Sequence, residues 1–225
     1  GGGLVQLSDV EGGTGGFVIN GITNDDYSGS SVSSAGDING DGLADIIIGT
    51  PSTDTNGIAS GTAYVVFGKQ DTTFVQLANV EAGEGGFPIY GGDKVHLAGA
   101  SVESAGDVNG DGYDDVLVGA PGDNNGENLA AGRAYVVFGR PGGAPLGLNH
   151  VEAGIGGFAM LGTGHNVLTG ESVSPAGDVN NDGLADVLVG AAQAGGDETS
   201  EGRAYVVFGK TDTDSLILDD VGAEG

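Results

Sequence analysis

The chain contains no cysteine and very few basic residues. Of its 225 residues, 6 are lysine or arginine, against 32 aspartates and glutamates. Without cysteine, neither disulfides nor thiolate metal sites can hold the fold together, and the redox compartment stays undetermined. No apolar run approaches the ~20 residues that a membrane-spanning helix needs. We therefore expect no membrane insertion.

The shortage of basic residues leaves a formal net charge of -26. A chain of this charge repels the phosphates of nucleic acids and anionic lipid surfaces, so neither is an expected partner. It also repels itself unless cations neutralise it, which suggests a divalent metal before any motif is considered. Acidity selected only for solubility, as in halophilic proteins, explains the charge equally well.

Helical periodicity is also missing, because no window keeps apolar residues at helical spacing over three turns. Valine, isoleucine, tyrosine and phenylalanine instead cluster in runs such as "AYVVFG". Glycine is abundant, with 48 residues and no G-X-Y period. This composition is typical of many short strands joined by tight turns, so we predict an almost all-β fold.

The sequence repeats itself every 70 or 71 residues. The acidic stretch "GDINGDGLADIIIG" at 36–49 returns as "GDVNGDGYDDVLVG" at 106–119 and "GDVNNDGLADVLVG" at 177–190, and "AYVVFG" recurs with it. We divide the chain into repeats at 1–71, 72–142 and 143–213, and interpret 214–225 as the start of a fourth. A regular period of this kind indicates a repeat architecture.

Each repeat is predicted to contain four strands, the first near "GGFPIYG", with the acidic stretch as the hairpin between the second and third. The run "AYVVF" is apolar throughout, so both faces of its strand must be buried. Four-stranded sheets stacked around an axis make a β-propeller. We predict three full antiparallel blades plus a partial strand; the alternative is a β-solenoid, whose repeats are usually much shorter.

The order "GASVESAGDVNGDGYDDVLVGAP" followed by "GRAYVVFG" is similar to the FG-GAP repeat, the blade of the integrin α head propeller and of many secreted or surface proteins of bacteria. The resemblance covers all three repeats. "GAP" at 119–121 stands as "GTP" at 49–51 and as "GAA" at 190–192. The resemblance implies an extracellular or cell-surface protein. Because no signal peptide is recognisable, a removed signal and a cytoplasmic location are both open from the residues alone.

The acidic loop carries oxygen-bearing side chains at its positions 1, 3, 5 and 9, a ligand set that suits a hard cation. Glycine at position 6 permits the sharp turn that lets the carbonyl of position 7 point inward. We predict three Ca²⁺ ions, about one per repeat. The ligands are Asp37, Asn39, Asp41, the Leu43 carbonyl and Asp45; Asp107, Asn109, Asp111, the Tyr113 carbonyl and Asp115; and Asp178, Asn180, Asp182, the Leu184 carbonyl and Asp186.

Position 4 of the loop is glycine, glycine and Asn181, residues that tolerate a left-handed backbone. An EF-hand would need a glutamate at position 12, where these loops have Ile48, Val118 and Val189. Calcium is favoured over magnesium because the ligands are mostly protein oxygens. Plain β-turns would explain a single loop, but three loops with every ligand position intact favour cation sites.

No catalytic residue and no organic cofactor site are predicted. The three histidines, His96, His150 and His165, occupy unrelated repeat positions, so zinc has little support and we interpret them as surface or turn residues. Every repeating aspartate is assigned to metal, which leaves no separate carboxylate pair for a glycosidase.

The resemblance to integrins implies a calcium-stabilised structural or adhesion module that presents loops to a protein or glycan partner, and not an enzyme. The alternative is a propeller or accessory domain of a secreted polysaccharide-acting enzyme.

Three repeats do not close a ring, because propellers typically have four to eight blades. Three explanations are open: the chain is a piece of a longer one, two chains form a homodimer that completes a six-bladed ring, or the outer repeats keep open faces. The segment 214–225 would suit a strand exchanged between two copies.

Overall fold

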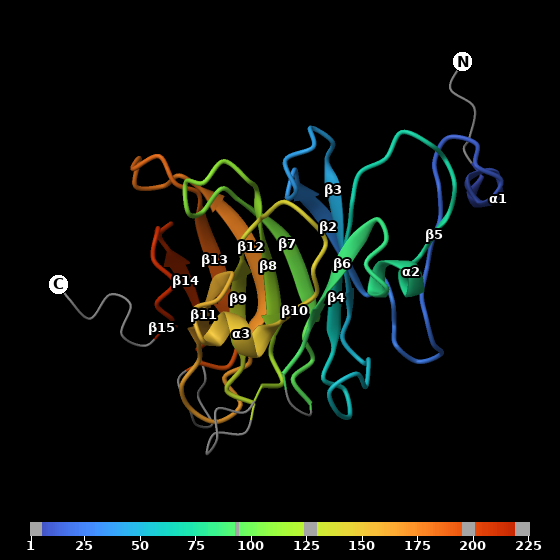
Figure 1. Ribbon diagram of the computed structural model, residues 1–225. Helices are drawn as coiled ribbons and strands as arrows, with labels where there is room; N and C mark the ends of the chain where they lie inside the picture. Colours follow the sequence, from blue (N-terminus) through green and yellow to red (C-terminus); the bar gives the residue numbers. More distant parts are fainter. Residues whose placement is uncertain (1–5, 93–94, 124–129, 195–200, 219–225) are drawn as a thin grey trace.

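The computed structural model describes residues 6–92, 95–123, 130–194 and 201–218. Within these ranges, three sheets lie side by side in a row, with the first repeat at one end and the third at the other (Figure 1). None of the helices in these ranges is long and apolar enough to cross a membrane. The prediction of an all-β fold built from propeller-type blades is confirmed.

Two of the three sheets share one pattern, and the third is shorter. The first has the order β10-β6-β4-β3-β2, from Leu146–Gly147, Gly86–Tyr90, Thr62–Val66, Asp45–Thr50 and Ser31–Gly36. The second has the order β15-β11-β9-β8-β7, from Leu216–Ile217, Gly157–Leu161, Arg133–Val137, Asp115–Ala120 and Ser101–Gly106. The third contains β12 (Thr169–Gly177), β13 (Asp186–Ala191) and β14 (Arg203–Val207).

Short elements accompany these sheets where each repeat begins. A separate parallel pair is formed by β1 (Ile19–Asn20) and β5 (Val75–Gln76). Three single-turn helices precede the first long strand of each repeat: α1 (Leu7–Glu11), α2 (Leu77–Glu81) and α3 (Leu148–Glu152). The apolar side chains Leu77 and Val80 of α2 are buried, as are Leu148 and Val151 of α3. These two helices therefore cap the core.

Each complete sheet takes its fourth strand from the next repeat. Strand β6 pairs antiparallel with β4 of the preceding repeat, and β11 pairs in the same way with β9. This corrects our expectation that the "GGFPIYG" strand belongs to the blade of its own repeat. A sequence period fixes the length of a repeat but not where its sheet begins. Neighbouring repeats therefore cannot separate without breaking backbone hydrogen bonds.

The apolar core lies between the sheets. One cluster joins the first sheet, through Ile47, Ala63 and Val65, to Val102, Val116 and Val118 of the second. The other joins Leu117, Ala134 and Val136 of the second sheet to Val173, Val187 and Val189 of the third. Strand β4 is covered on both faces and wholly buried, as the apolar run predicts, whereas β14 buries Val207 alone.

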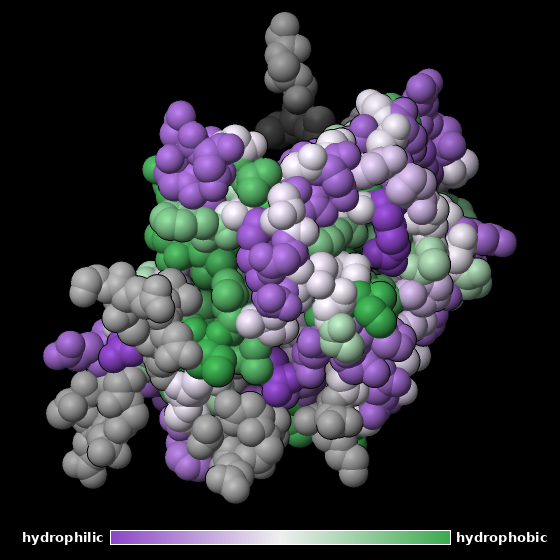
Figure 2. All heavy atoms as spheres, turned by 60° about the vertical axis from the view of Figure 1, so that its left-hand side comes forward, coloured by the Kyte–Doolittle hydropathy of each residue, from purple (hydrophilic) through white to green (hydrophobic). Residues whose placement is uncertain are grey.

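The third sheet leaves one apolar face uncovered, and the first sheet leaves part of its outer face exposed around Val32, although Ile48, Tyr64 and Val66 are buried. On the third sheet, Val206 is 41% exposed, whereas its repeat equivalents Val65 and Val136 are fully buried. Apolar residues gather on this side of the molecule in Figure 2. On the first sheet, Val32 is 61% exposed, whereas its equivalent Val102 is 1% exposed.

Glycine allows the backbones of neighbouring repeats to approach closely. A methyl group at Gly49 would lie 2.0 Å from the carbonyl oxygen of Gly99, and one at Gly119 would lie 2.0 Å from that of Gly170. The equivalent Gly190 of the third repeat has no following sheet among the described residues, and a methyl group there would meet its nearest neighbour, Ser172, at 3.4 Å.

The tight packing around Gly49 and Gly119, compared with the looser packing around Gly190, predicts the effects of three matched substitutions. Gly49→Ala and Gly119→Ala should each lower the free energy of unfolding by about 1–3 kcal/mol through overpacking, which is roughly 2–10 °C in Tm for a chain of this size. Gly190→Ala should change Tm by less than about 2 °C. The measurement is thermal unfolding by circular dichroism, and equal losses in all three variants would contradict the interface argument.

Candidate functional sites

The three acidic loops lie at the same end of their sheets, where each closes one hairpin. They connect β2 to β3, β7 to β8 and β12 to β13, and all three hairpins are antiparallel. They stand at the upper end of the sheets in Figure 1. The prediction that the acidic stretch joins the second and third strands of each repeat is confirmed.

The backbone of the loops has the left-handed turns that the sequence predicts. Position 4 has a φ of 76° at Gly40, 78° at Gly110 and 61° at Asn181. Asparagine thus takes the same conformation as the glycines it replaces, so the third loop keeps the shape of the other two.

Side chains at the first three predicted ligand positions organise each loop through Asx-type turns. In the first loop, Asp37 Oδ1 accepts from the backbone N–H of Asp41 at 3.0 Å, and Oδ2 accepts from that of Gly42 at 2.9 Å. Asn39 Oδ1 also accepts from the Asp41 N–H, at 2.8 Å. The equivalent bonds recur in the second and third loops. One pattern of side-chain contacts therefore shapes all three.

The aspartate at position 9 is buried in each repeat and joins the loop to the third strand of its sheet. Asp115 Oδ2 accepts from the backbone N–H of Val108, and Oδ1 accepts from that of Gly139, both at 2.8 Å. Asp45 makes the same two bonds to Ile38 and Gly68, and Asp186 makes them to Val179 and Gly209. Each carboxylate thus fixes two segments that are far apart in sequence.

The residue at position 2 of the loop packs into the next repeat. Ile38 and Val108 are fully buried in the two interrepeat clusters, whereas Val179 of the last repeat is 56% exposed. The carbonyl of Ile38 accepts from the N–H of Arg140 at 2.8 Å, and that of Val108 accepts from the N–H of Lys210 at 2.9 Å. The acidic loops are therefore also contacts between repeats.

Burial opposes the charge on these aspartates. It raises the pKa of Asp115 to about 7, although hydrogen bonds from Gly139 and Val108 lower it, and the charges of Asp111 and Asp107 raise it further. The pKa of Asp45 is raised for the same reasons. The electrostatic conditions at these positions favour a nearby positive charge.

The three carboxylates of a loop do not lie within 4.8 Å of one another. Among the residues that the structure describes, one group of three acidic or histidine side chains meets that distance, and it lies elsewhere. In the loops the carboxylate oxygens accept backbone hydrogen bonds instead. The calcium ligands named from the sequence are thus gathered in one loop per repeat, and their binding of metal stays a prediction.

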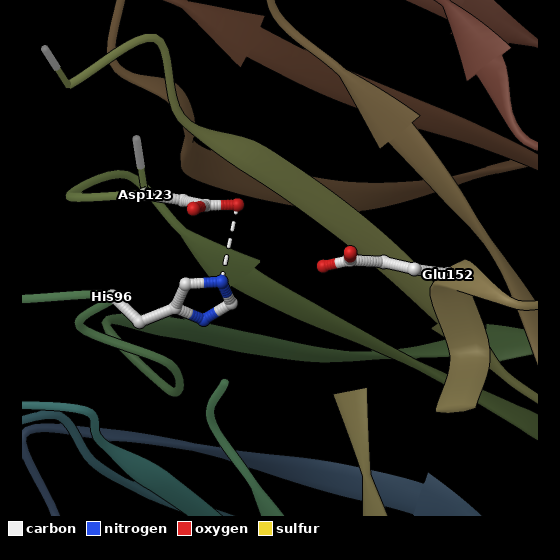
Figure 3. Close-up of side chains that lie close together, drawn as sticks. All are labelled: His96, Asp123 and Glu152. Carbon is white, nitrogen blue, oxygen red and sulfur yellow. Dashed lines mark ion pairs between the residues drawn. The ribbon is translucent and has the colours of Figure 1, made fainter. Parts of the chain in front are cut away.

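The closer group consists of His96, Asp123 and Glu152, whose ligand atoms all lie within 4.8 Å of one another (Figure 3). His96 Nε2 lies 3.0 Å from Asp123 Oδ2. His96 is 3% exposed and Asp123 is 5% exposed. Our expectation that His96 is an ordinary surface residue is therefore wrong, whereas His150 and His165 are exposed as expected.

Arg133 and Tyr135 of β9 complete this cluster. Arg133 Nε lies 2.7 Å from Asp123 Oδ2, and its Nη1 donates to Glu152 Oε1. The hydroxyl of Tyr135 donates to the same Glu152 oxygen at 2.7 Å. Burial raises the pKa of Tyr135 well above its usual value, so the phenol stays protonated. Apart from Tyr135, these residues line a cavity of about 460 Å³ together with Asn56, Gly92 and Asn149.

Sequence reasoning missed this cluster because two of its residues, His96 and Asp123, do not repeat, although Glu152 has Glu11 and Glu81 as its equivalents. The positions equivalent to His96 hold Asp26 and Val167, and those equivalent to Asp123 hold Thr53 and Ala194. An alignment of the three repeats would have identified these positions, because His96 and Asp123 of the second repeat differ there from the residues of the other two repeats.

Comparison with known proteins supports the family assignment. The family model for the FG-GAP repeat matches residues 28–66, 98–137 and 169–207, together more than half of the chain. Integrin alpha pat-2 of Caenorhabditis elegans is 32% identical over 199 residues, which cover 85% of this chain and 15% of that protein. Integrin alpha-6 of Homo sapiens is 31% identical over 157 residues, which cover 69% of this chain and 12% of that protein.

A second kind of relative is an enzyme. Phosphatidylinositol-glycan-specific phospholipase D of Mus musculus is 37% identical over 112 residues, which cover 48% of this chain and 12% of that protein. The chain thus spans less than a sixth of the length of these relatives. Its three matched segments each contain an acidic hairpin and the strand pair that follows it, and the chain belongs to the FG-GAP repeat family.

Proposed function

We propose that this protein is a calcium-binding FG-GAP propeller module that acts outside the cell in a structural or adhesive role. The observation that carries the proposal is the acidic loop, which occurs three times with one ligand pattern and one backbone shape. Calcium prefers six to eight oxygen ligands, and each loop supplies carboxylates, an amide oxygen and a backbone carbonyl.

Calcium would act by holding the loop against the next repeat. The loop places three carboxylates within nine residues, and a dication would offset their repulsion and the desolvation of the position-9 aspartate. The loop also places Ile38 and Val108 in the interrepeat core. A bound ion would therefore stiffen the contacts between repeats as well as the hairpin.

The adhesive role is supported by the resemblance to integrin α subunits, and an extracellular location by the same resemblance. We propose a protein or glycan as the partner. The phospholipase D relatives favour a second candidate, an accessory propeller domain of a secreted enzyme, for which polysaccharides are the substrates we would test.

A binding screen and an activity screen separate these two functions. We expect the protein to be retained in calcium by immobilised matrix proteins or glycans and released by a chelator. We expect no turnover of polysaccharides by the chain itself. Calcium-independent hydrolysis of a polysaccharide, or retention that a chelator does not change, would contradict the proposed adhesive module.

Calcium should raise the Tm of the protein. At a free concentration ten times Kd, each of the three proposed sites contributes about 1.4 kcal/mol, or roughly 3–5 °C in Tm. Asp111→Ala removes a ligand of the second site and should reduce the calcium-dependent increase by about a third. The measurement is differential scanning calorimetry with calcium or a chelator.

The control for charge is Glu84→Gln, which removes one negative charge from an exposed position outside the loops. This variant should keep the calcium-dependent increase of the wild type. A midpoint that calcium leaves unchanged in the wild type would contradict the metal assignment, and an equal reduction in both variants would show that bulk charge explains the effect.

We also propose that two copies pair head to tail into a six-bladed ring. The open face of the third sheet includes Val206. In the first and second sheets, the equivalent face packs against the next repeat of the same chain. The exposed surface around Val32 of the first sheet is equivalent to the surface that receives this contact in the second sheet and the third sheet. An apolar groove of about 290 Å³ on that first face is lined by Val32, Ile46 and Ile48, among others. The two faces are therefore complementary by repeat symmetry.

Light scattering over a range of concentrations tests this pairing. The wild type should approach twice the mass of one chain, and Val206→Asp should remain monomeric because it places a charge in the contact. Ile155→Asp is the control, since Ile155 is exposed and lies between α3 and β11 of the second sheet, not in either end sheet. A wild type that stays monomeric at high concentration would refute the ring.

A further inference from the structure

We propose that His96, Asp123 and Glu152 form a binding site for a divalent first-row transition metal such as Zn²⁺. The site lies at the end of the second sheet opposite to its acidic loop. Strand β8 runs from Asp115, the last predicted ligand of the loop, to Ala120, and Asp123 follows on the other side. His96 precedes β7, and Glu152 ends α3. The site is therefore distinct from the proposed calcium sites.

The other repeats show that the fold does not need this cluster. In the third repeat, the positions of His96 and Asp123 hold Val167 and Ala194, which are buried in a small apolar cluster. The first repeat has Thr53 at the Asp123 position, where it is also buried. A buried pair of titratable groups usually costs stability compared with apolar residues of similar size. Its presence in the second repeat alone indicates a role beyond packing.

The donor atoms fit a transition metal. Imidazole nitrogen and carboxylate oxygen are both donor types that Zn²⁺ binds, and two carboxylates balance the charge of a dication when the histidine is neutral. The three ligand atoms already lie within 4.8 Å of one another. Zn–N and Zn–O distances are about 2.0–2.2 Å, so the Glu152 side chain would move inward to complete the site.

In the described ranges of the chain, the Asp123 carboxylate lacks well-aligned hydrogen bonds at one of its oxygens. Its Oδ2 is fully buried and lies at ion-pair distance from His96 Nε2 and Arg133 Nε. Within the described part of the chain it makes no aligned hydrogen bond to either group. A buried carboxylate oxygen with imperfect partners is well suited to accept a metal ion.

Arg133 is the competitor for the metal. Its guanidinium contacts both carboxylates and holds them near the histidine. Tyr135, Asp123 and Glu152 raise the pKa of Arg133 against the lowering effect of burial, so it stays charged. Metal binding requires the guanidinium to turn away from Asp123, and the adjoining cavity of about 460 Å³ offers the space for that movement.

Three protein ligands leave a position open on a four-coordinate metal. Here that position faces the cavity, whose rim includes Asn56 and Asn149. The site can therefore hold an exchangeable water, and a carboxylate or imidazole of a partner could replace it. A site with such an open position would exchange ligands, unlike the closed sites that only hold a fold together.

The test is titration of the metal-free full chain with Zn²⁺ by calorimetry, in saturating Ca²⁺ so that the acidic loops are occupied. Co²⁺ serves as a second probe, because its visible absorption reports four-coordination. We expect one Zn²⁺ per chain in the wild type. His96→Val and Asp123→Ala, which install the residues of the third repeat, should weaken binding at least about 100-fold.

Arg133→Thr installs the residue of the first repeat, Thr62, and removes the competing charge. It should tighten Zn²⁺ binding at least about tenfold, since a like charge within a few ångströms is lost. His150→Val is the control, because His150 is exposed and lies outside the cluster. It should leave the affinity unchanged. Thermal unfolding of each variant establishes that the fold is retained.

Two results would overturn the proposal. The first is a wild type that binds no more Zn²⁺ than His96→Val under saturating Ca²⁺. The second is an Arg133→Thr variant that is folded and binds no more tightly than the wild type. Either result would assign the cluster to a purely structural ion-pair network.

Discussion

A buried aspartate at the end of each acidic loop is the constraint on which the rest of the structure depends. Asp45, Asp115 and Asp186 each accept one backbone N–H from their own loop and another from the residues after the third strand of the sheet. Such a carboxylate is costly to bury, and two charge-assisted hydrogen bonds offset part of that cost. These hydrogen bonds fix the loop so that its second residue packs against the neighbouring repeat.

Contact between repeats follows from this arrangement and from two features that support it. Each of the two complete sheets takes its fourth strand from the following repeat, and glycines such as Gly49 and Gly119 let the backbones approach. The result is a row of sheets with exposed apolar residues at each end, Val206 on the third sheet and Val32 on the first. The row is therefore suited to extension by further sheets of the same kind, whether from the same chain or from a second copy.

The repeated parts of the protein could be predicted from its sequence, and the unrepeated parts could not. The hairpin, the left-handed Asn181 and the burial of both faces of β4 follow from residue types at fixed spacing. The pairing of β6 with the sheet of the preceding repeat could not be predicted in this way, because a sequence period does not show where a repeat begins. Nor could the cluster of His96, Asp123 and Glu152, because its members come from three separate segments whose approach is set by the tertiary fold.

Hydrogen exchange of individual amides tests most directly whether the acidic loops hold the repeats together through a cation. The amides of Gly68, Gly139 and Gly209 donate to the position-9 aspartates. On addition of calcium their exchange should slow at least about tenfold, together with that of Ile38 and Val108 at the repeat contacts. Exchange rates at these amides that calcium leaves unchanged would contradict the account.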